Sequence, residues 1–297
     1  MKIETYPIGQ EASLTAYIPD AEYGYGLTRK RPGILLAPGG AYLIHATREK
    51  EGVALDFVAR GFNVYILNYS IGFTDRPSKE VNQCCLNTDN HYPQPVLEML
   101  EATHWLKANA DEMNLNSDAL FLMGFSAGGH LCASVGTMWK DPKLTSQLSF
   151  IPEQDELKAA GMVLGYPMIH PMSEGKFVVN DPDEPDALLM KDFLFDTRTP
   201  SREQMEETDL RTKVCKETIP AFIWHSTDDT VVNPANTTEF VLALQKHGID
   251  CQYHLFDHGG HGLGLANDTY ARTPQEDDRE IALWRSLAES WMKRRIA

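Results

Sequence analysis

The chain has 297 residues, of which 42% are hydrophobic and 23% are charged, a composition typical of a folded globular protein and not of a disordered one. Its 42 acidic and 27 basic side chains leave a formal net charge of −15, which disfavours binding to nucleic acid or to an anionic membrane surface. No apolar run reaches the roughly 18 residues of a membrane-spanning helix, and the start of the chain lacks the pattern of a secretion signal, so we expect a cytoplasmic protein. The five cysteines form no C-x-x-C pair, which indicates reduced thiols and disfavours a disulfide framework or a structural zinc site.

Short apolar runs alternate with amphipathic segments along the chain. The pattern predicts strands, the first of them at an edge of the sheet, over residues 14–19, 33–40, 62–69, 119–125, 159–167, 220–226 and 251–257. It predicts helices over residues 48–61, 94–109, 127–138, 237–247 and 279–294. This alternation is typical of an α/β fold, here a single domain over residues 1–297 with a mostly parallel central sheet of about eight strands and helices on both faces.

One connection is much longer than the others. Residues 171–209 separate two predicted strands, where a loop of about 2 to 6 residues is usual. Residues 181–209 carry 10 acidic and 3 basic side chains, so nearly half of the excess negative charge lies in this part of the chain. The segment is either a solvated excursion or a short acidic cap over a binding site, and its composition leaves both interpretations open.

The sequence GFSAGGH at residues 124–130 contains the pattern G-x-S-x-G between a predicted strand and a predicted helix. In that context the pattern predicts a tight turn that lifts the hydroxyl of Ser126 above the edge of the sheet. Gly124 and Gly128 leave room for neighbouring backbone, and the start of the helix offers unpaired N–H groups and partial positive charge. Ser126 is therefore the candidate nucleophile.

A serine hydroxyl becomes a good nucleophile when a base accepts its proton, and a carboxylate usually orients that base. Asp228 and Asp229 follow one predicted strand, and His258 and His261 follow the last one. All four lie after the carboxyl ends of strands, where open parallel sheets bind ligands, and the chain order Ser, Asp, His is that of α/β-hydrolases. From the residues alone, the choice within each pair stays open.

Other histidines have plainer interpretations. His254, His258 and His261 have a spacing that suggests zinc, but a strand followed by a glycine turn would not hold three imidazoles on one face, so no metal site is predicted. His130 follows the G-x-S-x-G pattern and His225 precedes the two candidate aspartates, and both are interpreted as packing residues.

The segment APGGAY at residues 37–42 follows the first central strand. Attack of a serine on a carbonyl group develops negative charge on oxygen, and two or three backbone N–H groups must face that charge. Glycines permit the close approach of the backbone that this requires. The N–H groups of Gly40 and Ala41, with that of Ala127 after the nucleophile, are the candidates for such an oxyanion hole.

Together these motifs resemble α/β-hydrolases of the carboxylesterase group that includes bacterial acetyl (xylan) esterases and hormone-sensitive-lipase-like enzymes. The resemblance covers nearly the whole chain and is carried by the segments APGGAY, ILNYS, GFSAGGHL, GYPMI, IWHSTDDTVV and GGHGLGLA. It implies that Ser126 is the nucleophile and His261 the base. Members of this group read H-x-x-x-D-x-x-V, which His225, Asp229 and Val232 match, so the resemblance favours Asp229 over Asp228 as the carboxylate.

One departure concerns the oxyanion segment, where lipase-like relatives carry H-G-G-G. Pro38 stands in the place of the histidine and Ala41 in that of the last glycine. The change moves the resemblance toward esterases that remove small acyl groups from sugars.

The function implied by the resemblance is a serine carboxylesterase that hydrolyses short-chain acyl esters, acetyl above all, of alcohols or carbohydrates through an acyl-enzyme. It requires no metal and no organic cofactor, and its expected partner is a small-molecule or acetylated carbohydrate substrate. The alternatives are an amidase, formamidase or peptidase on the same triad, and a non-catalytic binding protein on a hydrolase scaffold. Assembly as a homo-oligomer stays open.

Overall fold

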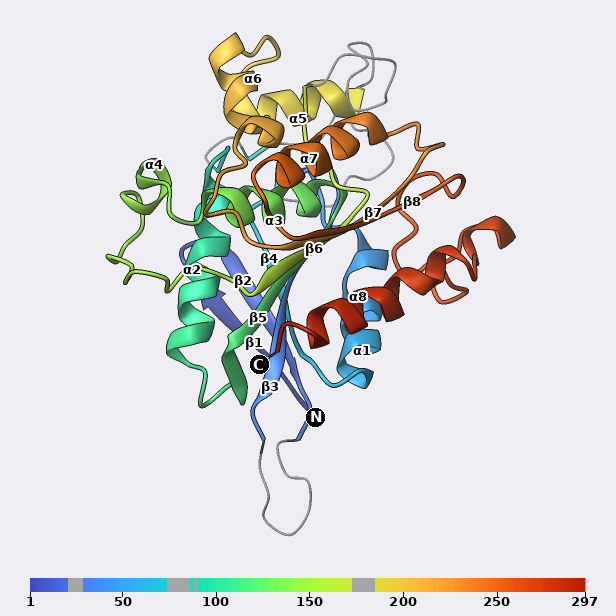
Figure 1. The fold of residues 1–297 in the computed structure, drawn as a ribbon. Coiled ribbons are helices and arrows are strands. Elements are labelled where there is room, and N and C mark those ends of the chain that lie inside the picture. Colours follow the sequence, from blue (N-terminus) through green and yellow to red (C-terminus); the bar gives the residue numbers. More distant parts are fainter. Residues whose placement is uncertain (21–28, 74–85, 88–89, 173–184, 297) are drawn as a thin grey trace.

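The computed structural model describes residues 1–20, 29–73, 86–87, 90–172 and 185–296. The strands of these residues form one eight-stranded sheet in the order β1-β2-β4-β3-β5-β6-β7-β8 (Figure 1). The strands are β1 (Lys2–Ile8), β2 (Ala12–Ile18), β3 (Arg31–Ala37), β4 (Asn63–Asn68), β5 (Leu115–Phe125), β6 (Gly161–Gly165), β7 (Ala221–Ser226) and β8 (Cys251–Phe256).

The sheet is mostly parallel, as the sequence predicts. Strands β3 to β8 all run in one direction, and β2 pairs antiparallel with both β1 and β4. A parallel sheet is covered on both faces, so its central strands are apolar without interruption. Residues 33–37 of β3 and 119–125 of β5 are accordingly all buried. The carboxyl ends of the parallel strands meet at one edge, and the candidate residues of the active site follow those ends.

The edge of the sheet differs from the prediction. The run 14–19 was expected at the edge, but β1 pairs with β2 from Lys2 opposite Ile18 to Ile8 opposite Ala12. The predicted edge strand therefore lies one place inside. In β1 only Ile8 is fully buried, so this strand carries little of the hydrophobic pattern by which strands are recognised.

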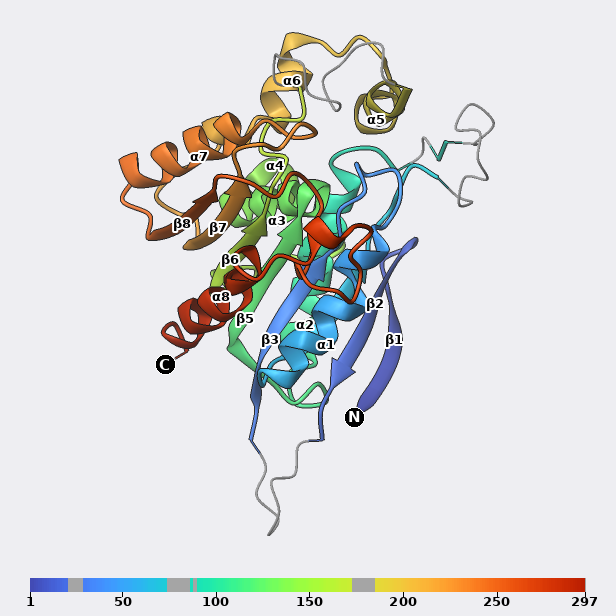
Figure 2. The same cartoon turned by 90° about the vertical axis from the view of Figure 1, so that its right-hand side faces the viewer.

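Helices cover both faces of the sheet (Figures 1 and 2). Buried residues of α1 and α8 form one core with one face, and those of α2, α3 and α7 form a second core with the other. Trp284 and Trp291 of α8 are fully buried, and the ring of Trp284 stacks on that of Trp224 with centroids 5.3 Å apart. The α-helices of the described residues are α1 (Glu51–Ala59), α2 (Gln94–Ala108), α3 (Ser126–Met138), α4 (Pro142–Thr145), α5 (Pro185–Phe195), α6 (Arg202–Thr208), α7 (Pro234–Lys246) and α8 (Trp284–Lys293).

The long connection between β6 and β7 is partly described. Residues 173–184 lie outside the described residues, and the remainder carries α5 and α6, which Figures 1 and 2 show beyond the carboxyl-end edge of the sheet. Met190, Phe193 and Leu194 of α5 are buried in the core of the α3 face. The ring of Phe193 stacks on that of Tyr42 with centroids 6.4 Å apart. The described part of this acidic segment thus packs against the segment that carries Gly40 and Ala41.

Two further expectations concern cysteines and membrane helices. Cys84 and Cys85 lie outside the described residues, and the other three cysteines are free thiols, a finding that concerns only the part of the chain that the structure describes. No helix within the described ranges combines the length and the apolar composition needed to cross a bilayer.

His130 joins α3 to two other segments. Its side chain is fully buried, and its Nε2–H donates to the carbonyl oxygen of Thr208 at 3.0 Å. Its Nδ1 accepts from the hydroxyl of Tyr42 at 2.8 Å, so the partners fit a neutral imidazole with one proton. Burial lowers the pKa of His130 to about 4. The interpretation of His130 as a packing residue is confirmed, and its partners tie α3 to the oxyanion segment and to the end of α6.

We expect the burial of His130 to make the protein less stable in acid. The unfolded imidazole takes up a proton near pH 6.5, whereas the folded one stays neutral until about pH 4, so stability falls as the pH falls between these values. Between pH 7.5 and 5 this linkage amounts to about 2 kcal/mol. Urea titrations should show a drop in the free energy of unfolding that is smaller by about this amount in His130→Gln than in the wild type. The variant His247→Gln, which removes an exposed histidine, should keep the wild-type drop, and an equal drop in all three proteins would contradict the expectation.

Candidate active site

Ser126 lies at the sharp turn between β5 and α3. It directly follows Phe125, the last residue of the strand, and its φ of 51° is in the left-handed region that L-residues seldom adopt. Such a strand-to-helix turn lifts the hydroxyl above the sheet edge. The turn predicted from the G-x-S-x-G pattern is present, with its serine partly exposed.

The two glycines of this pattern allow three backbone segments to meet. A Cβ atom on Gly124 would lie 2.1 Å from the carbonyl oxygen of Gly128, and a Cβ atom on Gly128 would lie 2.1 Å from the carbonyl oxygen of Ala37. Neither approach is compatible with a side chain. The start of α3 therefore lies directly against the end of β3, where the oxyanion segment begins.

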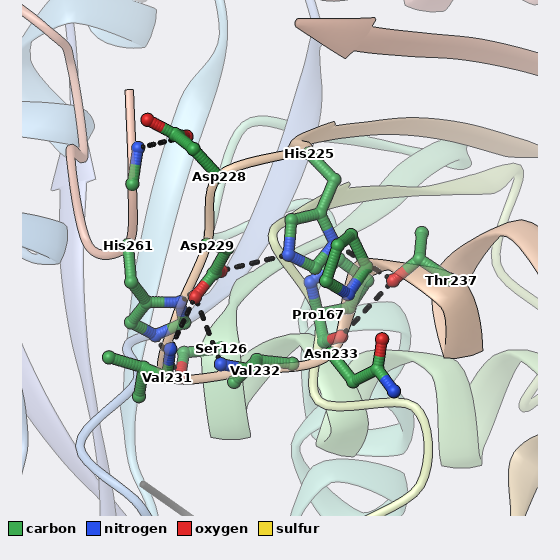
Figure 3. Close-up of polar contacts among 12 residues, drawn as sticks. Ser126, Pro167, His225, Asp228, Asp229, Val231, Val232, Asn233, Thr237 and His261 are labelled. Carbon is green, nitrogen blue, oxygen red and sulfur yellow. Dashed lines mark hydrogen bonds and ion pairs between the residues drawn. The ribbon is translucent and has the colours of Figure 1, made fainter. Parts of the chain in front are cut away.

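His261 and Asp229 lie beside Ser126 in one hydrogen-bonded row (Figure 3). Nε2 of His261 is 2.9 Å from the hydroxyl oxygen of Ser126, and Nδ1 of His261 is 2.7 Å from Oδ2 of Asp229. Because an ionised carboxylate only accepts, Nδ1 carries the ring proton and Nε2 accepts from the serine hydroxyl. The imidazole is 14% exposed and the carboxylate is fully buried, so the row leads from the interior to the surface.

His225 is a second imidazole on the same carboxylate. Its Nε2–H donates to Oδ2 of Asp229 at 2.8 Å, and its Nδ1 accepts from the hydroxyl of Thr237 at 2.9 Å. Figure 3 shows Asp229 between the two histidines. Burial lowers the pKa of His225, so this ring is neutral and acts as a donor to the carboxylate. The interpretation of His225 as a packing residue is therefore incomplete, and the first position of H-x-x-x-D is the signal that could have revealed its role.

The carboxylate of Asp229 accepts four hydrogen bonds. Besides the two imidazoles at Oδ2, the backbone N–H groups of Val231 and Val232 donate to Oδ1 at 2.8 and 2.9 Å. Burial acts to raise the pKa of Asp229, but the hydrogen bonds from His225 and His261 outweigh it, and the net pKa lies well below the usual range. Asp229 is thus a permanent negative charge at neutral pH.

Asp228 has a different place. Its two carboxylate oxygens accept from the backbone N–H groups of Gly259 at 3.2 Å and Gly260 at 2.8 Å, immediately before His261. The structure therefore brings both aspartates to the histidine loop, but only Asp229 contacts the imidazole. Of the two histidines that the residues left open, only His261 contacts Ser126.

The oxyanion segment passes beside Ser126. A Cβ atom on Gly39 would lie 2.9 Å from Cβ of Ser126, and Gly40 and Ala41 follow with positive φ values of 121° and 56°. Within the described residues, the N–H groups of Gly40 and Ala41 donate no hydrogen bond. Ala127 stands in the first turn of α3, where helical N–H groups lack internal partners.

Two further buried residues lie near this site: Glu49, which no motif marks, and Tyr166, which lies in the segment GYPMI. Oε2 of Glu49 accepts from the N–H of Gly39 at 2.7 Å, and Oε1 accepts from the hydroxyl of Tyr166 at 2.7 Å. The same hydroxyl accepts from the N–H of Gly264 at 2.9 Å. A glutamate within a charged stretch such as REKEG is normally read as exposed, which is why composition gave no indication of it.

The suspected zinc pattern has no counterpart in the structure. Nε2 of His254 contacts Gln252, His258 lies between Asp257 and Asp278, and His261 belongs to the row with Ser126. Among the residues that the structure describes, no group of three or more His, Cys, Asp or Glu side chains could hold a metal ion.

Known proteins resemble this chain over most of its length. Endo-1,4-beta-xylanase B of Butyrivibrio fibrisolvens is 30% identical over 243 residues, which are 81% of this chain and 34% of that protein. The chain spans between 34% and 54% of the length of the curated relatives it matches.

Solved structures resemble it as well. An acetyl ester-xyloside bifunctional hydrolase from Caldicellulosiruptor lactoaceticus is 27% identical, with a TM-score of 0.69 and coverage of 95% of this chain and 88% of the other. The α/β-hydrolase enzyme MGS-M1 from a Medee basin deep-sea metagenome library is 26% identical, with a TM-score of 0.72 and coverage of 99% and 98%. The family model described as BD-FAE matches residues 25–244, and the chain accordingly belongs to the BD-FAE family and has the α/β-hydrolase fold.

Proposed function

We propose that the chain is a serine carboxylesterase that hydrolyses short-chain acyl esters of alcohols or carbohydrates through an acyl-enzyme. The observation that carries the proposal is the row from Ser126 through His261 to Asp229, with contacts of 2.9 and 2.7 Å. A hydroxyl, a neutral imidazole and an ionised carboxylate in this order are the groups that nucleophilic acyl transfer requires.

In the first half of the reaction, Oγ of Ser126 attacks the ester carbonyl carbon while Nε2 of His261 takes the hydroxyl proton. Asp229 stabilises the imidazolium that forms and holds its Nδ1–H in place. The carbonyl oxygen becomes negative in the tetrahedral intermediate, and the N–H groups of Gly40, Ala41 and Ala127 face it. The intermediate then expels the alcohol, which receives its proton from His261, and Ser126 retains the acyl group.

In the second half, His261 takes a proton from water, and the resulting hydroxide attacks the acyl-enzyme carbonyl. The same N–H groups face the second tetrahedral intermediate. Its collapse releases the carboxylic acid and returns the proton from His261 to Oγ of Ser126. Every proton that moves passes through Nε2 of one imidazole, so the fixed position of Asp229 matters in both halves.

The acetyl preference is supported by two observations. The acetyl ester-xyloside hydrolase that resembles this chain acts, by its description, on acetyl esters and xylosides. The ring of Phe193 from α5 packs against that of Tyr42, so the acidic segment lies close to the oxyanion segment, and we propose that it limits the length of the acyl chain. We therefore propose an acetylated carbohydrate or another small acetyl ester as the substrate.

The role of Ser126 can be tested with Ser126→Ala. We expect this variant to lose covalent labelling by a fluorophosphonate and to lower kcat for p-nitrophenyl acetate by about 10⁴-fold or more, because the acyl-enzyme is proposed to form on this hydroxyl. Ser134→Ala removes a buried hydroxyl from the same helix and is the control, with labelling retained. Labelling that persists in Ser126→Ala would refute the proposal.

The acyl preference can be tested with p-nitrophenyl esters from acetate to palmitate, run beside acetylated xylo-oligosaccharides and a matched pair of ester and amide. We expect kcat/KM to be highest for acetate and to fall by about tenfold or more by the octanoate, because the proposed site takes a small acyl group. We also expect the enzyme to release acetate from the acetylated xylo-oligosaccharides. A maximum of kcat/KM at long acyl chains would refute the small-acyl preference. Faster cleavage of the amide than of the matched ester would favour the amidase alternative.

The two neighbouring aspartates should differ in their effect on kcat. Asp229→Asn removes the carboxylate that orients His261, and we expect a loss of about 10⁴-fold. Asp228→Asn alters only the contacts with Gly259 and Gly260, so a loss of about tenfold or less is expected. Steady-state kinetics on p-nitrophenyl acetate compares them, and a larger loss in Asp228→Asn would contradict the assignment.

A further inference from the structure

Glu49 is a buried carboxylate beside the candidate active site. It ends a short 3-10 turn, Thr47–Glu49, which Lys50 separates from α1, and is 2% exposed. In the described part of the chain, no ion pair involves its oxygens, and the guanidinium of neighbouring Arg48 turns away to Gly262, Tyr270 and Glu276. A carboxylate buried in this way is unfavourable unless its hydrogen bonds compensate.

The hydrogen bonds of Glu49 fit its ionised form. Gly39 N–H donates to Oε2, and the hydroxyl of Tyr166 has Glu49 and Gly264 as its two partners. Because the Gly264 N–H can only donate, the hydroxyl proton must point to Oε1 of Glu49. Both oxygens accept in these contacts. Burial raises the pKa of Glu49, and the hydrogen bonds from Tyr166 and Gly39 act against this rise and favour the ionised carboxyl.

One end of this network holds the oxyanion segment. The N–H of Gly39 is occupied by Glu49, and a Cβ on Gly39 would lie 2.6 Å from Oε2 of Glu49 and 2.9 Å from Cβ of Ser126. The carboxylate thus fixes the residue that stands directly beside the nucleophile. The following N–H groups, of Gly40 and Ala41, stay free of partners within the described residues.

The other end holds the histidine loop. The hydroxyl of Tyr166 fixes the backbone of Gly264, three residues after His261. The ring of Tyr166 also meets that of His261 edge to face, with centroids 4.9 Å apart. The same carboxylate therefore positions the loop of the base and the segment of the oxyanion hole, which follow different strands.

We propose that Glu49 is a positioning residue for the hydrolysis, an inference that rests on the function proposed above. Its carboxylate fixes the oxyanion segment and the His261 loop relative to Ser126, and its negative charge stabilises the imidazolium of His261 together with that of Asp229. Two buried carboxylates then act on one imidazole, one by direct contact and one through Tyr166.

The charged groups around His261 determine the direction in which loss of Glu49 should shift the pH dependence of kcat/KM. Three carboxylates lie near His261, those of Asp229, Glu49 and Asp228. Arg48 is the nearby cation, His225 is a neutral imidazole, and Tyr166 is a neutral phenol whose pKa burial raises well above its usual value. Removing a negative charge disfavours the imidazolium, so the pKa that limits kcat/KM on its acid side should fall. Removing only a hydroxyl should leave that pKa in place.

The test compares Glu49→Gln and Tyr166→Phe with the wild type and with Glu51→Gln. Glu51 is exposed and its nearest polar contact is the hydroxyl of Tyr17 at 3.4 Å, so its variant removes the same charge outside the site. Rates on p-nitrophenyl acetate are divided by the amount of serine that a fluorophosphonate labels, so unfolded protein does not count. Ser126→Ala serves as the blank.

We expect Glu49→Gln to lower kcat per labelled serine by about 10- to 100-fold with KM changed less than about threefold, because misplaced oxyanion donors affect the transition state more than the bound ester. Its acid-limb pKa should fall by about half a unit or more. Tyr166→Phe should lower kcat with this pKa unchanged, and Glu51→Gln should match the wild type.

A Glu49→Gln variant with wild-type kcat per labelled serine, or with an unmoved acid limb, would overturn the inference. If that variant yields no folded protein, Tyr166→Phe decides, and wild-type kcat in it overturns the inference as well. In these cases the wild type still hydrolyses the ester in a Ser126-dependent way. A wild type without such hydrolysis would instead refute the proposed function, and the role of Glu49 with it.

Discussion

The arrangement around Ser126 depends on one buried carboxylate. Asp229 accepts two backbone hydrogen bonds at one oxygen and two imidazoles at the other, and this leaves it no freedom to rotate. The turn after β7 supplies the backbone donors, β7 itself supplies His225, and the loop after β8 supplies His261. A carboxylate satisfied from three directions stays ionised in spite of its burial and can orient the base without relaxation of its surroundings.

The sequence predicted the positions of the candidate site residues better than it predicted the edge of the sheet. The G-x-S-x-G pattern was informative because each of its glycines is required for steric reasons. A Cβ atom at either position would lie 2.1 Å from a backbone oxygen, too close for any other residue. The central strands were predicted because a parallel sheet leaves a continuous apolar run. Strand β1 was missed because its only fully buried residue is Ile8, and an exposed strand that pairs on one side has no comparable pattern.

Other features depend on tertiary contacts that local sequence does not encode. Asp228 and Asp229 are chemically identical neighbours, and only the path of the turn decides that one faces His261 and the other faces Gly259 and Gly260. Glu49 lies in a charged stretch, and its burial follows from segments that are far away in the chain, at Tyr166 and Gly264. A charge that is buried for a long-range reason has no periodicity by which to recognise it.

The order of the strands also bears on how the chain folds. Ser126 and His261 are 135 positions apart, and they meet only when β8 has joined β7 at the far side of the sheet. Contacts of such long sequence separation form slowly, because the loop-closure entropy of the intervening chain must be overcome. A nascent chain that ends before residue 261 contains the turn with Ser126 but lacks the imidazole that contacts it. In the function proposed above, labelling of Ser126 depends on His261, so an active-site label would report that the last strand has docked.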